Sequence, residues 1–185
     1  RLVQRAQAEL PGIDLILEEA KTSALVSGLL SAKLDAAIIS LPTDEYILEV
    51  HELFREPFLC AVPSGHPLGE QHNLSLDDLA GRELILLEEG HCFRTQTMDL
   101  CLVSAAKENR MLRATSLETV RQFVSQGAGL TLMPQIARRE DDGLTYLSLE
   151  DGRFYREIAM VWRKGHSRAP LLLKIAALIA SLRAG

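Results

Sequence analysis

The chain of 185 residues has few aromatic side chains, few cysteines and no excess of positive charge. Aromatic residues make up 5% of it, so aliphatic side chains, within a total of 47% hydrophobic residues, have to build most of the core. Three cysteines are too few and too scattered for the disulfide framework of a small secreted domain. The formal net charge of −5 argues against a broad nucleic-acid-binding face, so any DNA contact has to come from elsewhere.

Long apolar runs and targeting signals are also missing. The longest apolar stretch, residues 171–182, is interrupted by Lys174 and is shorter than a membrane span. No signal peptide is recognisable, so the sequence predicts a cytoplasmic location and no membrane contact. The first residue, Arg1, lies inside a helical pattern and is not a methionine, which suggests a fragment of a longer protein.

Helical and strand-type periodicities alternate along the chain, without internal repeats or low-complexity linkers. This order predicts an α/β fold with helices covering mostly parallel sheets. Thr22 or Ser23 is expected to cap one helix and Ser116 another. Strands are predicted at residues 13–17, 35–41, 46–54, 58–62, 84–87, 112–114, 130–133, 145–149 and 158–162, and helices at 2–10, 22–33, 75–81, 92–107, 117–126 and 170–183.

Two cysteines, Cys92 and Cys101, lie nine positions apart in the segment GHCFRTQTMDLC, which is predicted to be helical. In one straight helix, nine residues turn through about 900° and rise roughly 13 Å. A disulfide needs α-carbons within about 7 Å of one another. The two cysteines therefore either never pair, or pair only by breaking the helix, in which case the bond is a conformational switch.

Three segments carry a resemblance to a known family: GHCFRTQTMDLC, RATSLETVRQFVSQGAGLTLMP and LSAKLDAAII. The whole chain resembles the regulatory domain of LysR-type transcription regulators, and the first segment is similar to the peroxide sensors of that family. The resemblance implies two Rossmann-like subdomains of the type II periplasmic-binding-protein kind, with mixed sheets flanked by helices and a ligand cleft between them. Residues 1–54 plus 164–185 would form the first subdomain and residues 55–163 the second.

The resemblance also implies parts that this chain lacks. Family members begin with a winged helix-turn-helix that binds DNA, and their regulatory domain starts with a strand that has no counterpart here. It further implies a homodimer, paired through residues 117–126 and 50–54, and a tetramer in the full-length form. RNA polymerase is an implied partner, and no cofactor is implied.

Within this family, Cys92 reads as the peroxidatic cysteine and Cys101 as the resolving one. Cys92 would lie in the first turn of its helix, where unpaired backbone amides and the helix dipole favour the nucleophilic thiolate, and His91 and Arg94 could add positive charge. Attack on peroxide yields a sulfenic acid that condenses with a second thiol, and Cys101 is the nearby candidate. Glutaredoxin or thioredoxin would reduce the resulting disulfide. Cys60 is interpreted as structural.

The resemblance assigns a peroxide pocket as well. Thr22, His91 and Gln96 would position hydrogen peroxide, and Arg156 would hold Cys92 as a thiolate. Thr22 could equally be a helix cap, and Gln96 an exposed polar residue. A metal site is not expected, because these Cys and His residues lack the close ligand pairs of zinc sites. In the reduced helix, the sequence predicts that Cys101 is buried and that an apolar set points inward, namely Met98, Leu102 and Ala105.

Three functions remain open from the sequence. The first is a hydrogen-peroxide-sensing regulatory domain whose Cys92–Cys101 disulfide remodels the helix and the dimer. The second is an effector domain of the same family that binds a small metabolite, with incidental cysteines. The third is a thiol peroxidase, which would cycle rapidly with a dedicated reductase, whereas a sensor reacts stoichiometrically.

Overall fold

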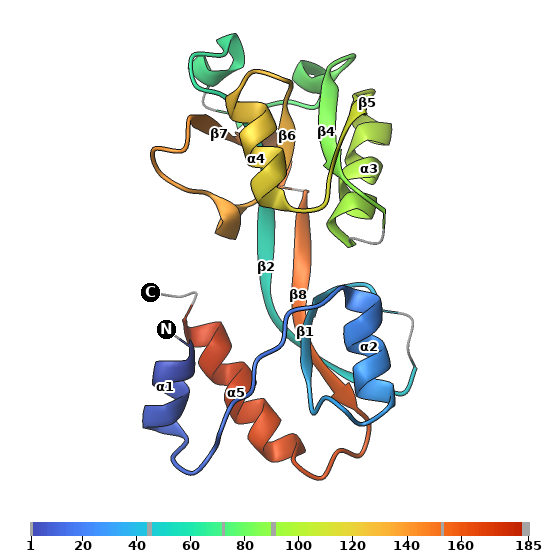
Figure 1. The fold of residues 1–185 in the computed structure, drawn as a ribbon, viewed down its shortest axis with the longest axis vertical. Helices are drawn as coiled ribbons and strands as arrows, with labels where there is room; N and C mark the ends of the chain where they lie inside the picture. The colour runs from blue at the N-terminus through green and yellow to red at the C-terminus, as the bar shows by residue number, and fades with distance from the viewer. Residues whose placement is uncertain (1, 44–45, 72, 90–91, 153, 183–185) are drawn as a thin grey trace. The chain divides into compact units, whose positions relative to one another are not determined.

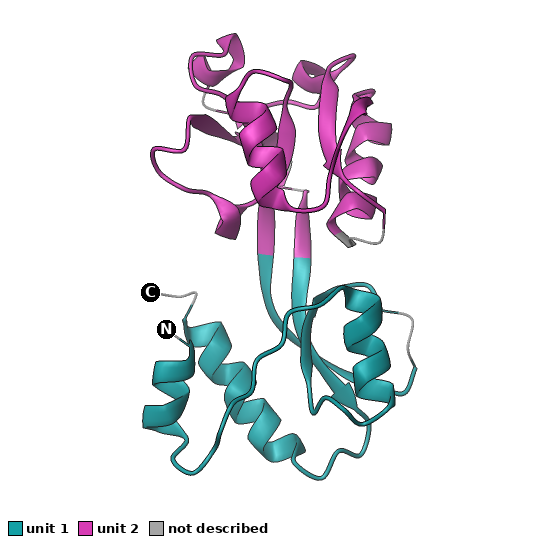
Figure 2. Cartoon of the chain, in the orientation of Figure 1, with its two compact units in different colours: residues 1–55, 157–185 teal, residues 56–156 magenta. Residues whose placement is uncertain are grey.

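The computed structural model describes residues 2–43, 46–71, 73–89, 92–152 and 154–182, except for the side chains of Cys92 and Asp151 (Figure 1). The chain forms two compact units, residues 1–55 with 157–185 (unit 1) and residues 56–156 (unit 2) (Figure 2). The second boundary falls earlier than the expected position at residue 163. The boundary lies earlier because residues 158–161, which precede the expected boundary, pair with residues 37–40 of unit 1.

Unit 1 combines three helices with strands that pair antiparallel. Its first strand pairs with the last strand of the chain, from Ala37 opposite Val161 to Ser40 opposite Ile158. The helices α1 and α5 pack against each other, as Figure 1 shows. The elements are α1 (Leu2–Glu9), α2 (Thr22–Leu30), β1 (Ala37–Ser40), the first half of β2 (Leu48–Pro63), most of β8 (Tyr155–Arg163) and α5 (Ala169–Ser181).

Unit 2 holds the larger core, with α3 and α4 flanking β4 (Figure 1). Strand β2 pairs antiparallel with β6 and β7, β3 pairs parallel with β7, and β4 pairs parallel with β5. With the β1–β8 pair, antiparallel pairs outnumber parallel ones, so the expectation of mostly parallel sheets is wrong and the sheets are mixed. The further elements are β3 (Asn73–Leu74), β4 (Glu83–Leu87), α3 (Cys92–Ser104), β5 (Lys107–Ala114), α4 (Leu117–Ser125), β6 (Thr131–Pro134) and β7 (Leu144–Leu149), with 3₁₀ turns at Pro67–Glu70, Asp77–Leu79, Gln135–Ala137 and Glu150–Gly152.

Two helix starts that the sequence predicted have different outcomes. The Ser116 hydroxyl accepts a hydrogen bond from the Thr119 amide at 3.2 Å, so the predicted cap of α4 is confirmed. Thr22, in contrast, is the first helical residue of α2. The N-cap position belongs to Lys21, whose side chain makes no capping hydrogen bond, so the prediction that Thr22 or Ser23 caps this helix is wrong.

The predicted strands differ from the observed ones at several places: β3 was not predicted, β5 begins at Lys107 and not at residue 112, and two further differences have a physical cause. Residues 13–17 have no strand partner within the described part of the chain, and Ile16 and Leu17 are 95% and 65% exposed. An apolar run becomes a strand only where another strand pairs with it, so this prediction is wrong. The two strands predicted at 46–54 and 58–62 form the single strand β2, because the proline between them, Pro57, is exposed and interrupts no core packing.

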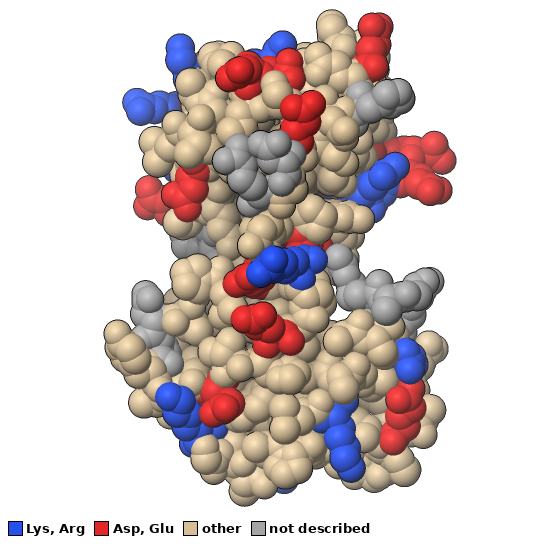
Figure 3. Space-filling view, turned by 180° about the vertical axis from the view of Figure 1, so that it is seen from behind, with Lys and Arg blue, Asp and Glu red and all other residues tan. Residues whose placement is uncertain are grey.

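The surface carries charges of both signs. The face drawn in Figure 3 shows acidic and basic side chains intermixed, without a broad basic area. Among the described residues, no helix combines the length and hydropathy needed to cross a membrane.

Candidate functional site

Helix α3 carries both cysteines of the predicted pair. It begins at Cys92 and continues without a break to Ser104, so Cys101 lies nine residues into the same helix. That spacing separates the two α-carbons by roughly 13 Å along the axis, about twice the separation that a disulfide tolerates. His91 and the Cys92 side chain lie outside the described residues.

One face of α3 packs into the core of unit 2. Leu102 and Val103 are 77% and 62% exposed, and Ala105 follows the end of the helix with a φ of 54°. The predicted inward packing of Leu102 and Ala105 is therefore wrong, while Met98 does pack against the core. Each residue turns the helix by about 100°, so burial of position 101 rotates position 102 away from the core. The buried positions are Phe93, Thr97, Leu100, Cys101 and Ser104.

Cys101 is a free thiol and is 4% exposed, which confirms the prediction that it is buried. Burial raises its pKa above the ordinary value of 9.0, and the nearby Glu108 carboxylate raises it further, while Arg94 offsets part of the rise. Near neutral pH the group is therefore protonated. A protonated thiol in the core is not a nucleophile, so Cys101 can react only after it leaves this environment.

Arg94 connects the first turn of α3 to two strands. Its Nη1 donates to the Leu87 carbonyl oxygen at the end of β4, at 2.8 Å. Its Nη2 lies 2.9 Å from Glu108 Oε1 on β5. The positive charge of Arg94, expected near Cys92, is thus paired with the Glu108 carboxylate. The two contacts also link α3 to β4 and β5.

Arg156 is held by a buried carboxylate. Glu56, on β2, is 1% exposed, and its Oε2 accepts a hydrogen bond from Arg156 Nε at 2.7 Å and forms an ion pair with Arg156 Nη2 at 2.6 Å. The other oxygen, Oε1, accepts from the Ile136 amide at 2.9 Å. Sequence reasoning missed Glu56. A glutamate next to the apolar segment PFLCAV is unusual enough to have pointed to a buried ion pair, because a buried charge needs a partner.

Arg156 also reaches the start of α3. Its guanidinium carbon lies 5.7 Å from the centroid of the Phe93 ring, within the range of a cation–π contact. Phe93 packs edge-on against Phe58, with 5.1 Å between ring centroids. The structure therefore brings Arg156 to the residue that follows Cys92.

The remaining predicted pocket residues are placed as follows. Gln96 is half-buried in α3, one turn after Cys92. Thr22 is half-buried at the start of α2, in unit 1. The approach of Thr22 and Gln96 to a peroxide molecule at Cys92 stays a prediction.

Cys60 and His51 both belong to strand β2. Cys60 is fully buried in β2, and burial raises its pKa to about 12. The ring of His51 lies 6.3 Å from that of Trp162, a contact that the sequence did not suggest. Over the residues that the structure describes, no group of three or more His, Cys, Asp or Glu side chains is arranged to hold a metal ion.

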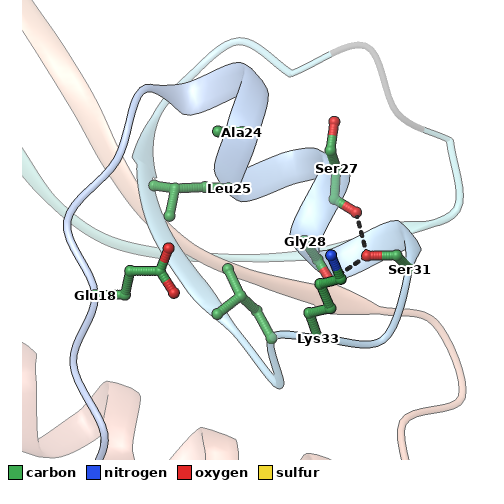
Figure 4. A pocket seen from close by; sticks show the side chains of 8 residues that line it. Glu18, Ala24, Leu25, Ser27, Gly28, Ser31 and Lys33 are labelled. Carbon is green, nitrogen blue, oxygen red and sulfur yellow. Dashed lines mark hydrogen bonds between the residues drawn. The ribbon is translucent and has the colours of Figure 1, made fainter.

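Unit 1 contains a hollow beside α2 with a volume of about 450 Å³ (Figure 4). At one end, the Ser31 hydroxyl donates to the Ser27 carbonyl oxygen at 2.8 Å. The volume suits a metabolite and is far larger than hydrogen peroxide requires. The lining residues are Glu18, Ala24, Leu25, Ser27, Gly28, Ser31, Lys33 and Leu34.

Comparison with known proteins gives consistent matches. The family model of the LysR substrate binding domain matches residues 1–185. The hydrogen peroxide-inducible genes activator of Pectobacterium carotovorum subsp. carotovorum is 41% identical over 159 residues, which cover 84% of this chain and 52% of that protein. The chain spans about half the length of the curated relatives it matches.

Two crystal structures of OxyR match the fold in different redox states. The reduced form has a TM-score of 0.89 at 33% identity, covering 100% of this chain and 88% of that chain. The oxidised form has a TM-score of 0.87 at 35% identity, covering 99% and 88%. The chain is thus similar in fold to both forms.

Proposed function

We propose that this chain, which belongs to the LysR substrate binding domain family, is the hydrogen-peroxide-sensing regulatory domain of a transcription regulator. The observation that carries the proposal is the placement of Cys101 as a free, buried thiol in the same continuous helix that begins at Cys92. A disulfide between them requires α3 to unfold in part. Oxidation thereby becomes a change of shape that a dimer and its DNA-binding domains can transmit.

The first chemical step takes place at Cys92. Its thiolate attacks one peroxide oxygen, an S–O bond forms, the O–O bond breaks, and the departing hydroxide takes a proton to become water. The product is a sulfenic acid. Arg156, supported by Glu56, supplies positive charge at the start of α3, and Thr22, His91 and Gln96 orient the peroxide.

The second step brings Cys101 to Cys92. Cys101 leaves the core, loses its proton and attacks the sulfenic sulfur; the S–S bond forms and water leaves. Release of Cys101 also removes Leu100, which is 1% exposed, from its packing. Burying one leucine side chain is worth about 1.5–3 kcal/mol, and about 30 mV corresponds to 1.4 kcal/mol for a two-electron couple. The reduction potential of this disulfide is therefore tens of millivolts higher than that of an unstrained disulfide. A cytoplasmic glutaredoxin or thioredoxin can reduce it.

The DNA-facing part of the mechanism depends on the whole protein. In this proposal, the domain forms a homodimer through α4 and residues 50–54, and a tetramer when the N-terminal winged helix-turn-helix is attached. Remodelling of α3 changes the spacing of the DNA-binding domains and their contact with RNA polymerase. Each domain reacts with one equivalent of hydrogen peroxide before it has to be reduced again, and the reaction needs no cofactor.

The test is intact mass and limited proteolysis before and after one equivalent of hydrogen peroxide. The wild type should lose about 2 Da, and Cys101→Ser should gain about 16 Da as a trapped sulfenic acid. New cleavage sites should appear between residues 92 and 107 in the wild type only. Cys60→Ser is the matched control and should behave as the wild type. An unchanged mass after peroxide would contradict the proposal.

A second candidate is an effector domain that responds to a metabolite, and the hollow beside α2 favours it. This candidate predicts that Cys92→Ser leaves the transcriptional response to the metabolite intact. The peroxide-sensing proposal predicts that Cys92→Ser abolishes the transcriptional response to hydrogen peroxide. A thiol peroxidase is distinguished by turnover, because it would consume many equivalents of peroxide per chain when thioredoxin is supplied.

A further inference from the structure

Glu56 is a buried carboxylate that contacts Arg156 and that the cysteine chemistry above does not by itself explain. A carboxylate that is 1% exposed is costly unless other groups stabilise it. Here the Ile136 amide holds Oε1, and two nitrogens of Arg156 hold Oε2. The backbone amide fixes the carboxylate, and the carboxylate in turn fixes the guanidinium.

Four side chains form a closed set around the first turn of α3. Glu56 and Phe58 are two positions apart on β2 and both are buried. Glu56 binds Arg156, Arg156 lies over the ring of Phe93, and Phe93 packs against Phe58. The position of the guanidinium relative to the start of α3 is therefore determined from two sides, by an ion pair and by an aromatic ring.

We infer that Glu56 is a positioning residue for peroxide reduction, an inference that rests on the proposed function. Attack by a thiolate breaks the O–O bond, and negative charge develops on the departing oxygen. A cation stabilises that charge most when it is already in place. A guanidinium carries a fixed positive charge, so the contribution of Arg156 depends on its position. Glu56 keeps it over the residue next to Cys92.

If Glu56 acts by positioning Arg156, its loss should affect the reaction of Cys92 with peroxide more than the reaction of Cys92 with other electrophiles. Alkylation of Cys92 by iodoacetamide requires the thiolate but expels iodide, which needs no nearby cation. Loss of the positioning should therefore lower the pH-independent rate constant for peroxide and leave that for iodoacetamide nearly unchanged. A purely structural role for Glu56 would alter both rate constants together.

The experiment is a double-mutant cycle of Glu56→Gln and Arg156→Gln in a background where Cys60 and Cys101 are serine, so that Cys92 is the only thiol. Rate constants are measured across pH to separate thiolate formation from reactivity. Glu56→Gln should slow the peroxide reaction at least about tenfold, because small misplacements of a reacting group are costly. The alkylation constant should change by a factor of about three or less. With Arg156→Gln present, Glu56→Gln should have no further effect.

Folding and the proposed function are controlled separately. If Glu56→Gln does not fold, Glu56→Asp replaces it and should give the same selective loss, because the carboxylate is withdrawn by one methylene group. An unchanged peroxide rate, or additive effects of the two substitutions, would overturn the inference and leave the proposed function standing. A wild-type Cys92 no faster with peroxide than free cysteine would overturn the proposed function, and the inference with it.

Discussion

Leu100 provides a direct test of whether oxidation takes α3 apart. Its side chain is 1% exposed in the core of unit 2 and immediately precedes Cys101. Leu100→Ala should lower the unfolding free energy of the reduced domain by about 2–5 kcal/mol, the usual cost of this truncation in a core. If the disulfide form no longer buries Leu100, its stability should change much less.

This difference has a measurable redox consequence. Destabilising only the reduced form makes reduction less favourable, so the potential should become more negative by roughly 40–100 mV if the full cost of about 2–5 kcal/mol is expressed. The potential is measured by equilibration with glutathione buffers, followed by alkylation and mass spectrometry. The same variants are unfolded in urea to obtain the stability of each redox form.

The matched control lies two positions further along the same helix. Leu102 is 77% exposed, so Leu102→Ala removes the same atoms without removing core packing. It should leave both the stability and the potential close to wild type. Equal potentials for Leu100→Ala and wild type, despite a large loss of reduced-state stability, would refute the claim that α3 loses its packing on oxidation.

Four further predictions concern the charges and burial of unit 2. Cys60, whose pKa burial raises to about 12, should resist alkylation in the folded protein, as peptide mapping after iodoacetamide treatment can check. Glu108→Gln should lower the raised pKa of the buried Cys101 thiol in the reduced domain, measured as the pH dependence of thiolate absorbance in a Cys92→Ser background. Because the folded-state pKa of Cys101 is raised, its contribution to the reduced domain's stability is present below pH 9.0 and is lost as the pH rises through the folded value. The side chain of Arg121 is 4% exposed and pairs with Asp142. Arg121→Ala should lower the unfolding free energy by about 3–5 kcal/mol, because the Asp142 charge loses its partner. Urea unfolding tests this prediction.

The sequence alone determined the local features of the site. The apolar spacing after Gly90 predicted one helix for both cysteines, and Ser116 predicted the start of α4; both are confirmed. These features depend on residues within a few positions of one another, so periodicity and capping chemistry are sufficient to predict them. The family resemblance rested on equally local strings of residues.

The tertiary structure decided which residues meet and which faces are covered. Residues 13–17 have the composition of a strand, but no neighbouring strand pairs with them within the described chain. Leu102 is apolar yet faces outward, because the packing of α3 sets its rotation. Glu56 and Arg156 lie 100 positions apart, so the segment around Glu56 can suggest a buried ion pair but cannot identify Arg156 as the partner. Their ion pair exists because β2 and β8 fold side by side, and periodicity within either strand carries no information about its distant partner.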